Sequence, residues 1–413
     1  MEGYKHTELG WIPDDWDCLE LSHITQKERP VSYGIVQTGL PVKDGIKCIR
    51  VLDIVNGKID DDNLITTSHK ISNAYKRTVL QDGDLVMALR GKIGELAKAT
   101  KSHEGYNLTR GVALVAPKAN YDSEYLKQQM SSPLFRDYLM GHLNGSALKE
   151  LAINVIRKIK VPIPKSKSEQ LKIADVLSTW DKSIETLTQL IAAKQQLKKG
   201  LMQQLLTGKK RLPGFKGKWE VKKIKQLGKI ESGGTPDTKI VEYWDGQIDW
   251  ITPTDITGLN GYRFIEHTQR KITNAGLKNS SATLIPANSV IICTRATIGD
   301  CAINLKPITT NQGFKTIIPK DVNYMFLYYK MLSIKDVMIE RANGSTFLEI
   351  SKTDFENLEV LVPPTESEQT VIGSFLEKLD EEIDLLKKQH ESLKLQKQGL
   401  MQQLLTGKKR VKV

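Results

Sequence analysis

Two short loops combine an arginine with glycine directly after an apolar run, a pattern that suits contact with nucleic acid. The loops are Arg90-Gly91-Lys92-Ile93-Gly94 and Arg295-Ala296-Thr297-Ile298-Gly299. A glycine-containing turn can approach a phosphate backbone closely, and the guanidinium can clamp a phosphate or pair bidentately with guanine. The alternative is that these arginines hold the turn or form ion pairs. The sequence therefore predicts DNA contacts from Arg90, Lys92, Arg295 and Thr297.

Other cations give a weaker signal. Arg110 and Arg263 are added to the predicted DNA contacts, and Arg270 and Lys271 are further candidates, although a solvated charge is the commoner role for each. With 60 Lys and Arg against 48 Asp and Glu, the chain has a net charge of +12. Such an excess attracts polyanions at long range. Charge alone leaves a merely basic, soluble protein as the alternative.

Motifs for catalysis are missing from the sequence. There is no G-x-x-x-x-G-K-[ST] phosphate loop and no H-E-x-x-H zinc helix. An amino-methyltransferase needs an Asn/Asp-Pro-Pro loop that ends in an aromatic residue, whereas Pro363-Pro364 follows Val362 and precedes Thr365. Pro236-Asp237 fits a turn better than a nuclease carboxylate. We predict no catalytic residue, no metal site and no cofactor in this chain.

Cysteine spacing and hydropathy indicate the cellular compartment of the protein. Cys18, Cys48, Cys293 and Cys301 show neither C-x-x-C nor metal-ligand spacing, which favours a reducing cytoplasm. No apolar run approaches the roughly 18 residues that span a bilayer, and the N-terminus lacks a secretory signal. We expect a cytoplasmic protein that does not enter a membrane.

The sequence contains an internal duplication. Residues 200–211 (GLMQQLLTGKKR) recur unchanged at 399–410, an offset of 199 residues, and positions 168–211 share 21 identities with 367–410. The same offset pairs Asn144-Gly145-Ser146 with Asn343-Gly344-Ser345. Upstream the two copies match less closely, although Trp16 still aligns with Trp219. Each half therefore holds a variable region followed by a shared segment, which is the pattern of a duplication whose bodies diverged.

The shared segments predict two long helices of about 39 residues, because apolar residues recur at spacings of three and four. Ser168 and Ser367 are predicted N-caps, and Gly208 and Gly407 are predicted C-terminal caps. Such a length favours a coiled coil over an ordinary core helix. Lysines near the apolar seam indicate a specific pairing, and each helix is expected to pair with the other. The seam lysines and the apolar stripes are Lys194, Lys198 and Lys397; Trp180, Ile184, Leu187, Ile191, Leu201 and Leu205; and Leu379, Ile383, Leu386, Leu393, Leu400 and Leu404.

The variable regions contain short strand-like runs and two helical stretches, so each is expected to be a mixed sheet-and-helix domain. The fold class is then α+β: two mixed sheet-and-helix domains joined by two long antiparallel coiled-coil helices, with pseudo-twofold symmetry from the duplication. The predicted strands are 84–89, 112–116, 289–293 and 316–318, and the predicted helices are 125–140 and 324–341. The predicted segments are domain 1 (1–165), spacer helix 1 (166–211), domain 2 (212–364) and spacer helix 2 (365–413).

Two antiparallel helices would act as a ruler that carries one domain at each end. A helix of about 39 residues is roughly 58 Å long at 1.5 Å per residue. That length spans at most about 17 base pairs of B-DNA at about 3.4 Å each. Because the two bodies differ in sequence, the geometry predicts a split, asymmetric target with an unread spacer.

The whole chain resembles the specificity subunits of type I restriction-modification systems. The features that carry the resemblance are the opening Glu8-Leu9-Gly10-Trp11-Ile12-Pro13-Asp14-Asp15-Trp16, the Asn-Gly-Ser turn, and Pro-Ile-Pro followed by Ser-Glu-Gln and a helix ending Leu-Leu-Thr-Gly. The joint Pro164-Lys165-Ser166-Lys167 is slightly off the family pattern.

The resemblance implies a non-catalytic subunit that chooses the DNA address. It implies double-stranded DNA and two methyltransferase subunits as partners, the latter using S-adenosylmethionine on an adenine in each half-site. Two motor-nuclease subunits that use ATP and Mg would complete the assembly. Two other classes remain as alternatives: a coiled-coil interaction scaffold without sequence-specific DNA binding, and a DNA-reading fragment of a fused nuclease-methyltransferase.

Overall fold

The computed structural model describes residues 2–142, 150–343 and 348–412. The chain divides into two compact units, Met1–Leu187 with Gln389–Val413 (unit 1) and Thr188–Lys388 (unit 2). Each unit thus combines one variable region with part of each shared segment. Most of the predicted Asn-Gly-Ser turns, 144–146 and 344–345, lies outside the described residues.

Unit 1 is built around a four-stranded sheet of order β10-β9-β12-β4 and a three-stranded sheet of order β11-β5-β8, with the pairs β1-β2, β13-β3 and β6-β7. The strands are β1 Tyr4–Thr7, β2 Gly10–Pro13, β3 Trp16–Glu20, β4 Ser32–Tyr33, β5 Ile46–Ile49, β6 Ile54–Val55, β7 Lys58–Ile59, β8 Ile65–Thr67, β9 Leu85–Ala88, β10 Leu96–Lys98, β11 Asn107–Leu108, β12 Val112–Val115 and β13 Lys160–Pro164. The helices are α1 Leu21–Ile24, α2 His69–Ala74, α3 Ser123–Met130, α4 Pro133–Gly141 and α5 Ile153–Lys158.

Unit 2 repeats this plan with a five-stranded sheet of order β15-β22-β19-β20-β17, a three-stranded sheet of order β18-β16-β21 and the pair β14-β23. The strands are β14 Glu220–Lys223, β15 Gly228–Ser232, β16 Trp244–Ile251, β17 Phe264–Ile265, β18 Lys271–Ile272, β19 Val290–Cys293, β20 Cys301–Asn304, β21 Thr309–Thr310, β22 Phe314–Pro319 and β23 Glu359–Val362. The helices are α7 Pro253–Gly258, α8 Asn274–Lys278, α9 Tyr324–Ser333, α10 Lys335–Glu340 and α11 Lys352–Glu356.

The mixed sheet-and-helix character predicted for the variable regions is confirmed, and the predicted runs correspond to β9, β12, β19 and β22. Each predicted helical stretch is in fact two helices. The first breaks because the Ser132 hydroxyl accepts a hydrogen bond from the Phe135 amide and starts a new helix with Pro133 at its first position.

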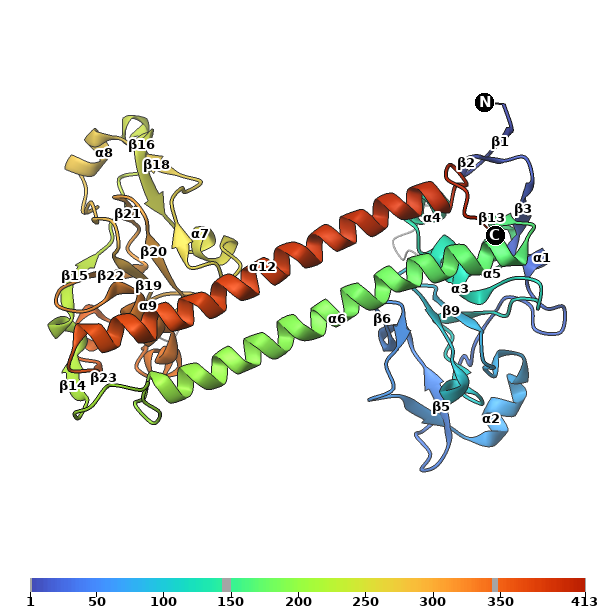
Figure 1. Ribbon diagram of the computed structural model, residues 1–413, viewed down its shortest axis with the longest axis horizontal. Coiled ribbons are helices and arrows are strands. Elements are labelled where there is room, and N and C mark those ends of the chain that lie inside the picture. The colour runs from blue at the N-terminus through green and yellow to red at the C-terminus, as the bar shows by residue number, and fades with distance from the viewer. Residues whose placement is uncertain (1, 143–149, 344–347, 413) are drawn as a thin grey trace. The chain divides into compact units, whose positions relative to one another are not determined.

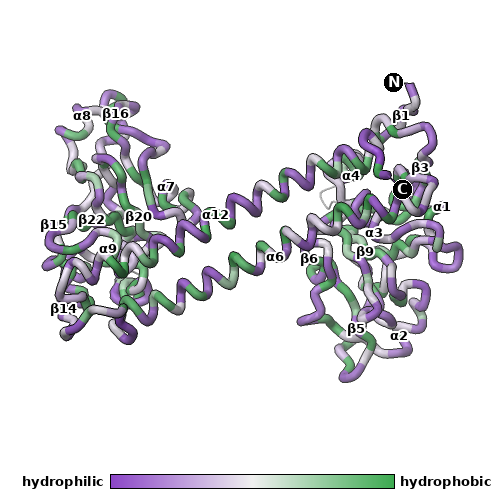
Figure 2. Tube along the Cα trace, viewed as in Figure 1, coloured by the Kyte–Doolittle hydropathy of each residue, from purple (hydrophilic) through white to green (hydrophobic). Residues whose placement is uncertain are grey.

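The shared segments form α6, Lys167–Leu205, and α12, Glu366–Leu404, each of 39 residues. They are the long green and red helices of Figure 1, and hydrophobic and hydrophilic residues alternate along both (Figure 2). The predicted N-caps were wrong, because both helices begin before the serines; the Thr365 hydroxyl accepts from the Glu368 amide at 3.4 Å. The predicted C-terminal glycines are confirmed, since Gly208 and Gly407 adopt left-handed φ values of 69° and 68°.

Gly200 and Gly399 lie inside these helices, and a Cβ at either position would meet nothing within 4 Å. Glycine in a helix interior costs roughly 0.5–1 kcal/mol relative to alanine. We therefore expect Gly200→Ala and Gly399→Ala each to raise the free energy of unfolding by about that amount, measured by urea denaturation. Gly407→Ala is the opposite control, because its Cβ would lie 2.4 Å from the Pro13 Cγ. A loss of stability in the first two variants would contradict this account.

Candidate nucleic-acid interface

The two arginine loops have the same backbone shape. In the first loop Gly91 and Gly94 have φ of 68° and 79°, and at the equivalent positions of the second loop Ala296 and Gly299 have φ of 55° and 86°. Each arginine pairs through its backbone with a glutamate far along the chain, Arg90 with Glu150 and Arg295 with Glu349. The sequence match between the loops therefore extends to their conformation and to their neighbours.

The structure brings the three residues predicted for domain 1 together on an exposed surface of unit 1. Arg90 is exposed and lies over Gly111, where a Cβ would be 2.9 Å from its Nε. Arg110, the residue before that glycine, is also exposed. The Lys92 ammonium donates to the Ile54 carbonyl oxygen at 3.2 Å, and half of the lysine side chain is exposed. Within the part of the chain that the structure describes, the Arg90 guanidinium forms no hydrogen bond or ion pair, so its donors are available.

In the equivalent loop of unit 2, the polar side chains are paired with or buried against other residues of the same unit. The Arg295 guanidinium forms an ion pair with Glu349 at 2.7 Å, which is the structural role that the sequence left open. The Thr297 hydroxyl is buried beside the Cys293 thiol and does not reach solvent. Contact with DNA through that hydroxyl would therefore require the loop to change conformation.

Arg263 is buried against α12. Its side chain is only 5% exposed, and its guanidinium lies 3.4–3.6 Å from carboxylate oxygens of Glu377, Glu381 and Asp384 on α12. Arg263 is therefore not accessible to a phosphate or a base in this structure, and the predicted DNA contact stays a prediction. The burial depends on where α12 packs, which the local sequence does not reveal.

The Arg270 side chain is held in place by two tryptophan rings, which its sequence context does not indicate. Its guanidinium carbon lies 3.9 Å from the ring centre of Trp244 and 5.0 Å from that of Trp250. The indole nitrogens are fixed by the carbonyl oxygens of Asp237 and Gly234. Stacking on a fixed aromatic face orients the planar donor edge of an exposed arginine. At the equivalent register of the three-stranded sheet in unit 1, Cys48 pairs with Ile65, so this platform belongs to unit 2 alone.

An aspartate on each long helix ties three elements together within its unit. In unit 1, Asp181 of α6 accepts from the Gln128 side-chain amide of α3 at 2.6 Å and from the Lys397 ammonium of α12 at 2.7 Å. In unit 2, the residue 199 positions later, Asp380, accepts from the Tyr329 hydroxyl at 2.6 Å and from the Lys198 ammonium. Two of the three predicted seam lysines, Lys198 and Lys397, thus meet these aspartates, and the third, Lys194, pairs with Glu382 at 2.6 Å.

The repeated Ser-Glu-Gln and Lys-Lys-Arg segments meet each other. Glu368, 1% exposed, pairs with Arg211 and accepts from the Trp219 indole at 3.2 Å. In unit 1 the equivalent Glu169 pairs with Arg410 at 2.7 Å. Each glutamine bridges its unit as well, since Gln170 and Gln369 donate to the carbonyl oxygens of Pro164 and Pro363. The tail arginines are therefore structural, a role that the sequence analysis missed although the identity of both copies pointed to it.

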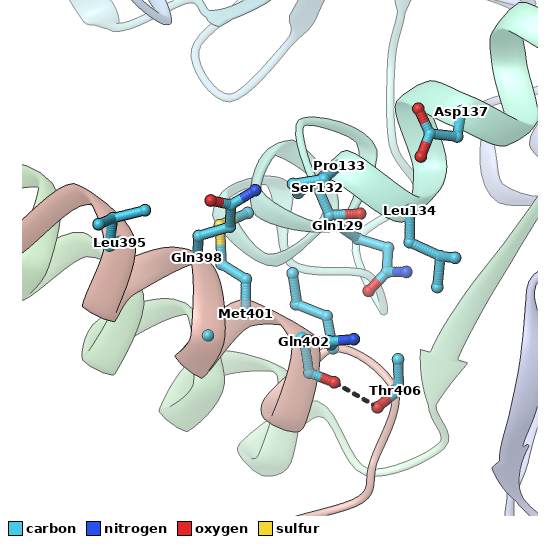
Figure 3. A pocket seen from close by; sticks show the side chains of 12 residues that line it. Gln129, Ser132, Pro133, Leu134, Asp137, Leu395, Gln398, Met401, Gln402 and Thr406 are labelled. Atoms are coloured by element: carbon cyan, nitrogen blue, oxygen red, sulfur yellow. Dashed lines mark hydrogen bonds between the residues drawn. The ribbon is translucent and has the colours of Figure 1, made fainter.

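A cavity of about 380 Å³ opens in unit 1 between the α3–α4 turn and the C-terminal part of α12 (Figure 3). Its wall combines side-chain amides such as Gln129, Gln398 and Gln402 with leucines. At the position equivalent to Gln129, unit 2 has Lys330, whose ammonium donates to the Leu206 carbonyl oxygen at 2.8 Å; burial lowers the pKa of Lys330 to about 8. The residues that line the cavity are amides, hydroxyls and apolar side chains with a single carboxylate, Asp137, and they form no cluster of titratable groups.

Groups that could support other chemistry are buried or dispersed. Burial raises the pKa of Cys48 to about 11 and that of Cys293 to about 12, so these thiols are not activated nucleophiles. No group of three or more His, Cys, Asp or Glu suited to a metal ion occurs within residues 2–142, 150–343 and 348–412. In the same part of the chain no helix is long and apolar enough to cross a membrane.

The family model for the type I restriction modification DNA specificity domain matches the chain twice, at residues 40–195 and 216–395. The chain belongs to this family. Each match covers most of one variable region and much of the long helix that follows it, so the two copies of the specificity domain coincide with the internal duplication.

Two proteins of Methanocaldococcus jannaschii are among its relatives. The type I restriction enzyme MjaIX specificity subunit is 39% identical over 178 residues, which is 42% of this chain and 41% of that protein. The putative type I restriction enzyme MjaX specificity subunit is 26% identical over 435 aligned residues, covering 100% of this chain and 97% of that protein. The chain thus spans less than half of the first relative and nearly all of the second.

Solved structures share the fold of this specificity-domain protein. A chain from a study of complex assembly and conformational transition in the type I R-M system aligns with a TM-score of 0.62 at 18% identity, covering 96% of this chain and 99% of that chain. The type I restriction-modification S subunit from M. genitalium aligns with a TM-score of 0.58 at 14% identity, covering 94% and 96%. The mixed sheet-and-helix fold with two specificity domains therefore has counterparts among solved structures.

Proposed function

We propose that this chain is the non-catalytic DNA specificity subunit of a type I restriction-modification complex and that it reads a split, asymmetric target with one domain for each half-site. The observation that carries the proposal is the duplicated specificity domain whose two copies keep the frame and differ in their exposed cations. Unit 1 presents Arg90 and Arg110, whereas unit 2 presents Arg270 on a tryptophan pair. Two readers with different donors suit two different half-sites.

The helices α6 and α12 serve as an antiparallel coiled-coil ruler in this proposal. Two ion pairs support it, because Lys198 meets Asp380 in unit 2 and Lys397 meets Asp181 in unit 1. A lysine in an apolar seam covers it with its methylene stem while the ammonium pairs outside, which fixes register at some cost in stability.

Partners supply the chemistry. Two methyltransferase subunits would bind S-adenosylmethionine and modify an adenine in each half-site of double-stranded DNA, and two motor-nuclease subunits would use ATP and Mg. This chain acts in the cytoplasm and contributes only the recognition of the target DNA sequence. The family membership supports that division of labour.

The arginine loops give a direct test of the two-reader assignment. We expect Arg90→Ala to weaken recognition of one half-site, while the bases read at the other half-site stay as in the wild type. Losing one good arginine contact costs about 1–3 kcal/mol of discrimination. Arg295→Ala should act on the other half-site and less strongly, because Glu349 already competes for its guanidinium. The measurement is genome-wide adenine methylation by the chain co-expressed with its cognate methyltransferase.

Lys210→Ala is a matched control, since it removes an exposed cation from the tail after α6. It should leave both half-sites unchanged. Equal losses at both half-sites in Arg90→Ala, or no loss at either, would refute the assignment of this loop to one reader.

A further inference from the structure

The guanidinium of Arg263 joins the edge of the large sheet in unit 2 to one face of α12. Arg263 directly precedes β17, the edge strand, and its carbonyl oxygen accepts from the Ile303 amide of β20 at 2.9 Å. Glu377, Glu381 and Asp384 follow one another at spacings of four and three, so their carboxylates share one helical face. Three like charges on one face repel each other, and the single guanidinium between them offsets that repulsion.

Two aromatic rings also lie against this guanidinium. The guanidinium carbon of Arg263 lies 4.8 Å from the ring centre of Phe264 and 5.7 Å from that of Tyr262. The arginine is therefore held by cation–π contacts as well as by charge, and salt screens it less than a surface ion pair. A second attachment, from Tyr329 of α9 to Asp380, lies within the same two turns of the helix, because Asp380 is three residues after Glu377 and four before Asp384. Two attachments, one from the sheet edge and one from α9, restrict movement of the domain on the helix more than either alone.

Unit 1 has the same attachment in a much weaker form. Glu185, which is 199 positions before Asp384, pairs with Lys58 of β7. The Lys58 and Glu185 side chains are 65% and 41% exposed, against 5% for Arg263. Exposed pairs of this kind contribute about 0–1 kcal/mol at most. The duplication therefore kept the site on the helix but made one clamp strong and the other weak.

We propose that Arg263 is a positioning residue that fixes the angle of the second recognition domain on α12 and thereby sets how strictly the complex measures the spacer between half-sites. This inference rests on the proposed function. Arg263 itself touches no base, so it affects the distance and phase between half-sites and leaves the base sequence read unchanged. The first domain, held by Lys58 alone at this position, adjusts to the DNA.

The test compares the wild-type chain, Arg263→Met and the matched control Lys58→Met, each in complex with the cognate methyltransferase. The probes are DNA duplexes that carry the half-sites mapped for the wild type, at the native spacer and at spacers one base pair longer and shorter. We expect Arg263→Met to lower the ratio of methylation rates between native and altered spacers by about tenfold, which corresponds to about 1.4 kcal/mol. Lys58→Met should keep the wild-type ratio, and the bases read should be the same in all three proteins.

A second variant keeps the inference falsifiable if Arg263→Met does not fold. Glu377→Gln with Glu381→Gln leaves Arg263 and Asp384 in place and removes two partly exposed carboxylates. It should also lower the spacer ratio. Full spacer discrimination in either folded variant, or a change in the bases read, overturns the positioning role. A wild-type complex that methylates no split motif overturns the proposed function itself, so the two failures are distinguishable.

Discussion

Replacing Arg211 with methionine is expected to lower the free energy of unfolding by about 3 kcal/mol, because it leaves the Glu368 carboxylate buried without its cation. Glu368 is 1% exposed, and its other side-chain partner is the Trp219 indole. A methionine offers no hydrogen-bond donor in place of the lost guanidinium. The measurement is urea denaturation, with hydrogen exchange to locate the loss of protection in unit 2.

Three variants make this prediction specific. Lys210→Met removes a neighbouring exposed cation and should leave stability unchanged. Arg211→Met combined with Glu368→Gln should recover part of the loss, because the neutral amide is less costly to bury. Arg410→Met should produce the same effect in unit 1, where Glu169 is 4% exposed. No change of stability in Arg211→Met, or loss of protection in both units together, would contradict the account.

Lengthening both long helices by one heptad should widen the preferred spacer by about three base pairs. Seven residues add about 10.5 Å and keep the helix faces nearly in register, and about 3.4 Å of duplex corresponds to one base pair. The insertions belong between Leu187 and Thr188 and between Lys388 and Gln389, where the two compact units meet in sequence. Every ion pair within a unit is then retained. Methylation mapping of the lengthened chain reports the new spacer.

A heptad inserted in α6 alone is the control for the ruler. It makes the two helices unequal in length, so we expect lower stability and loss of methylation, with no defined new spacer. If the doubly lengthened chain kept the wild-type spacer, the helices would not measure the distance between half-sites.

The sequence predicted the features that depend on local patterns. Apolar periodicity located the long helices, and Gly208 and Gly407 were recognisable as caps because they follow the last apolar residues of the stripe. The helix starts were misplaced because two hydroxyl residues follow each proline, Ser166 and Ser168 in the first copy and Thr365 and Ser367 in the second, and only packing selects between them. The Asp181 and Asp380 contacts were also detectable, since both aspartates and both partner lysines recur at the offset of 199 inside a stretch where few other residues are identical.

The sequence did not predict which cations are free. Arg263 looks like Arg110 in the sequence, yet one is buried against α12 and the other is exposed. The difference arises from residues more than a hundred positions away. Arg270 was ranked low because its aromatic partners, Trp244 and Trp250, lie on another strand and meet it only after the sheet has formed. Long-range packing decides the availability of a charge, and charge alone is visible in a single sequence.

The most direct test of the central claim is to co-express this chain with its cognate methyltransferase subunit and to map adenine methylation genome-wide by single-molecule sequencing. The account predicts one motif with two unlike half-sites and an unread spacer of fixed length. Absence of methylation by a correctly assembled complex would contradict it and would favour the coiled-coil scaffold.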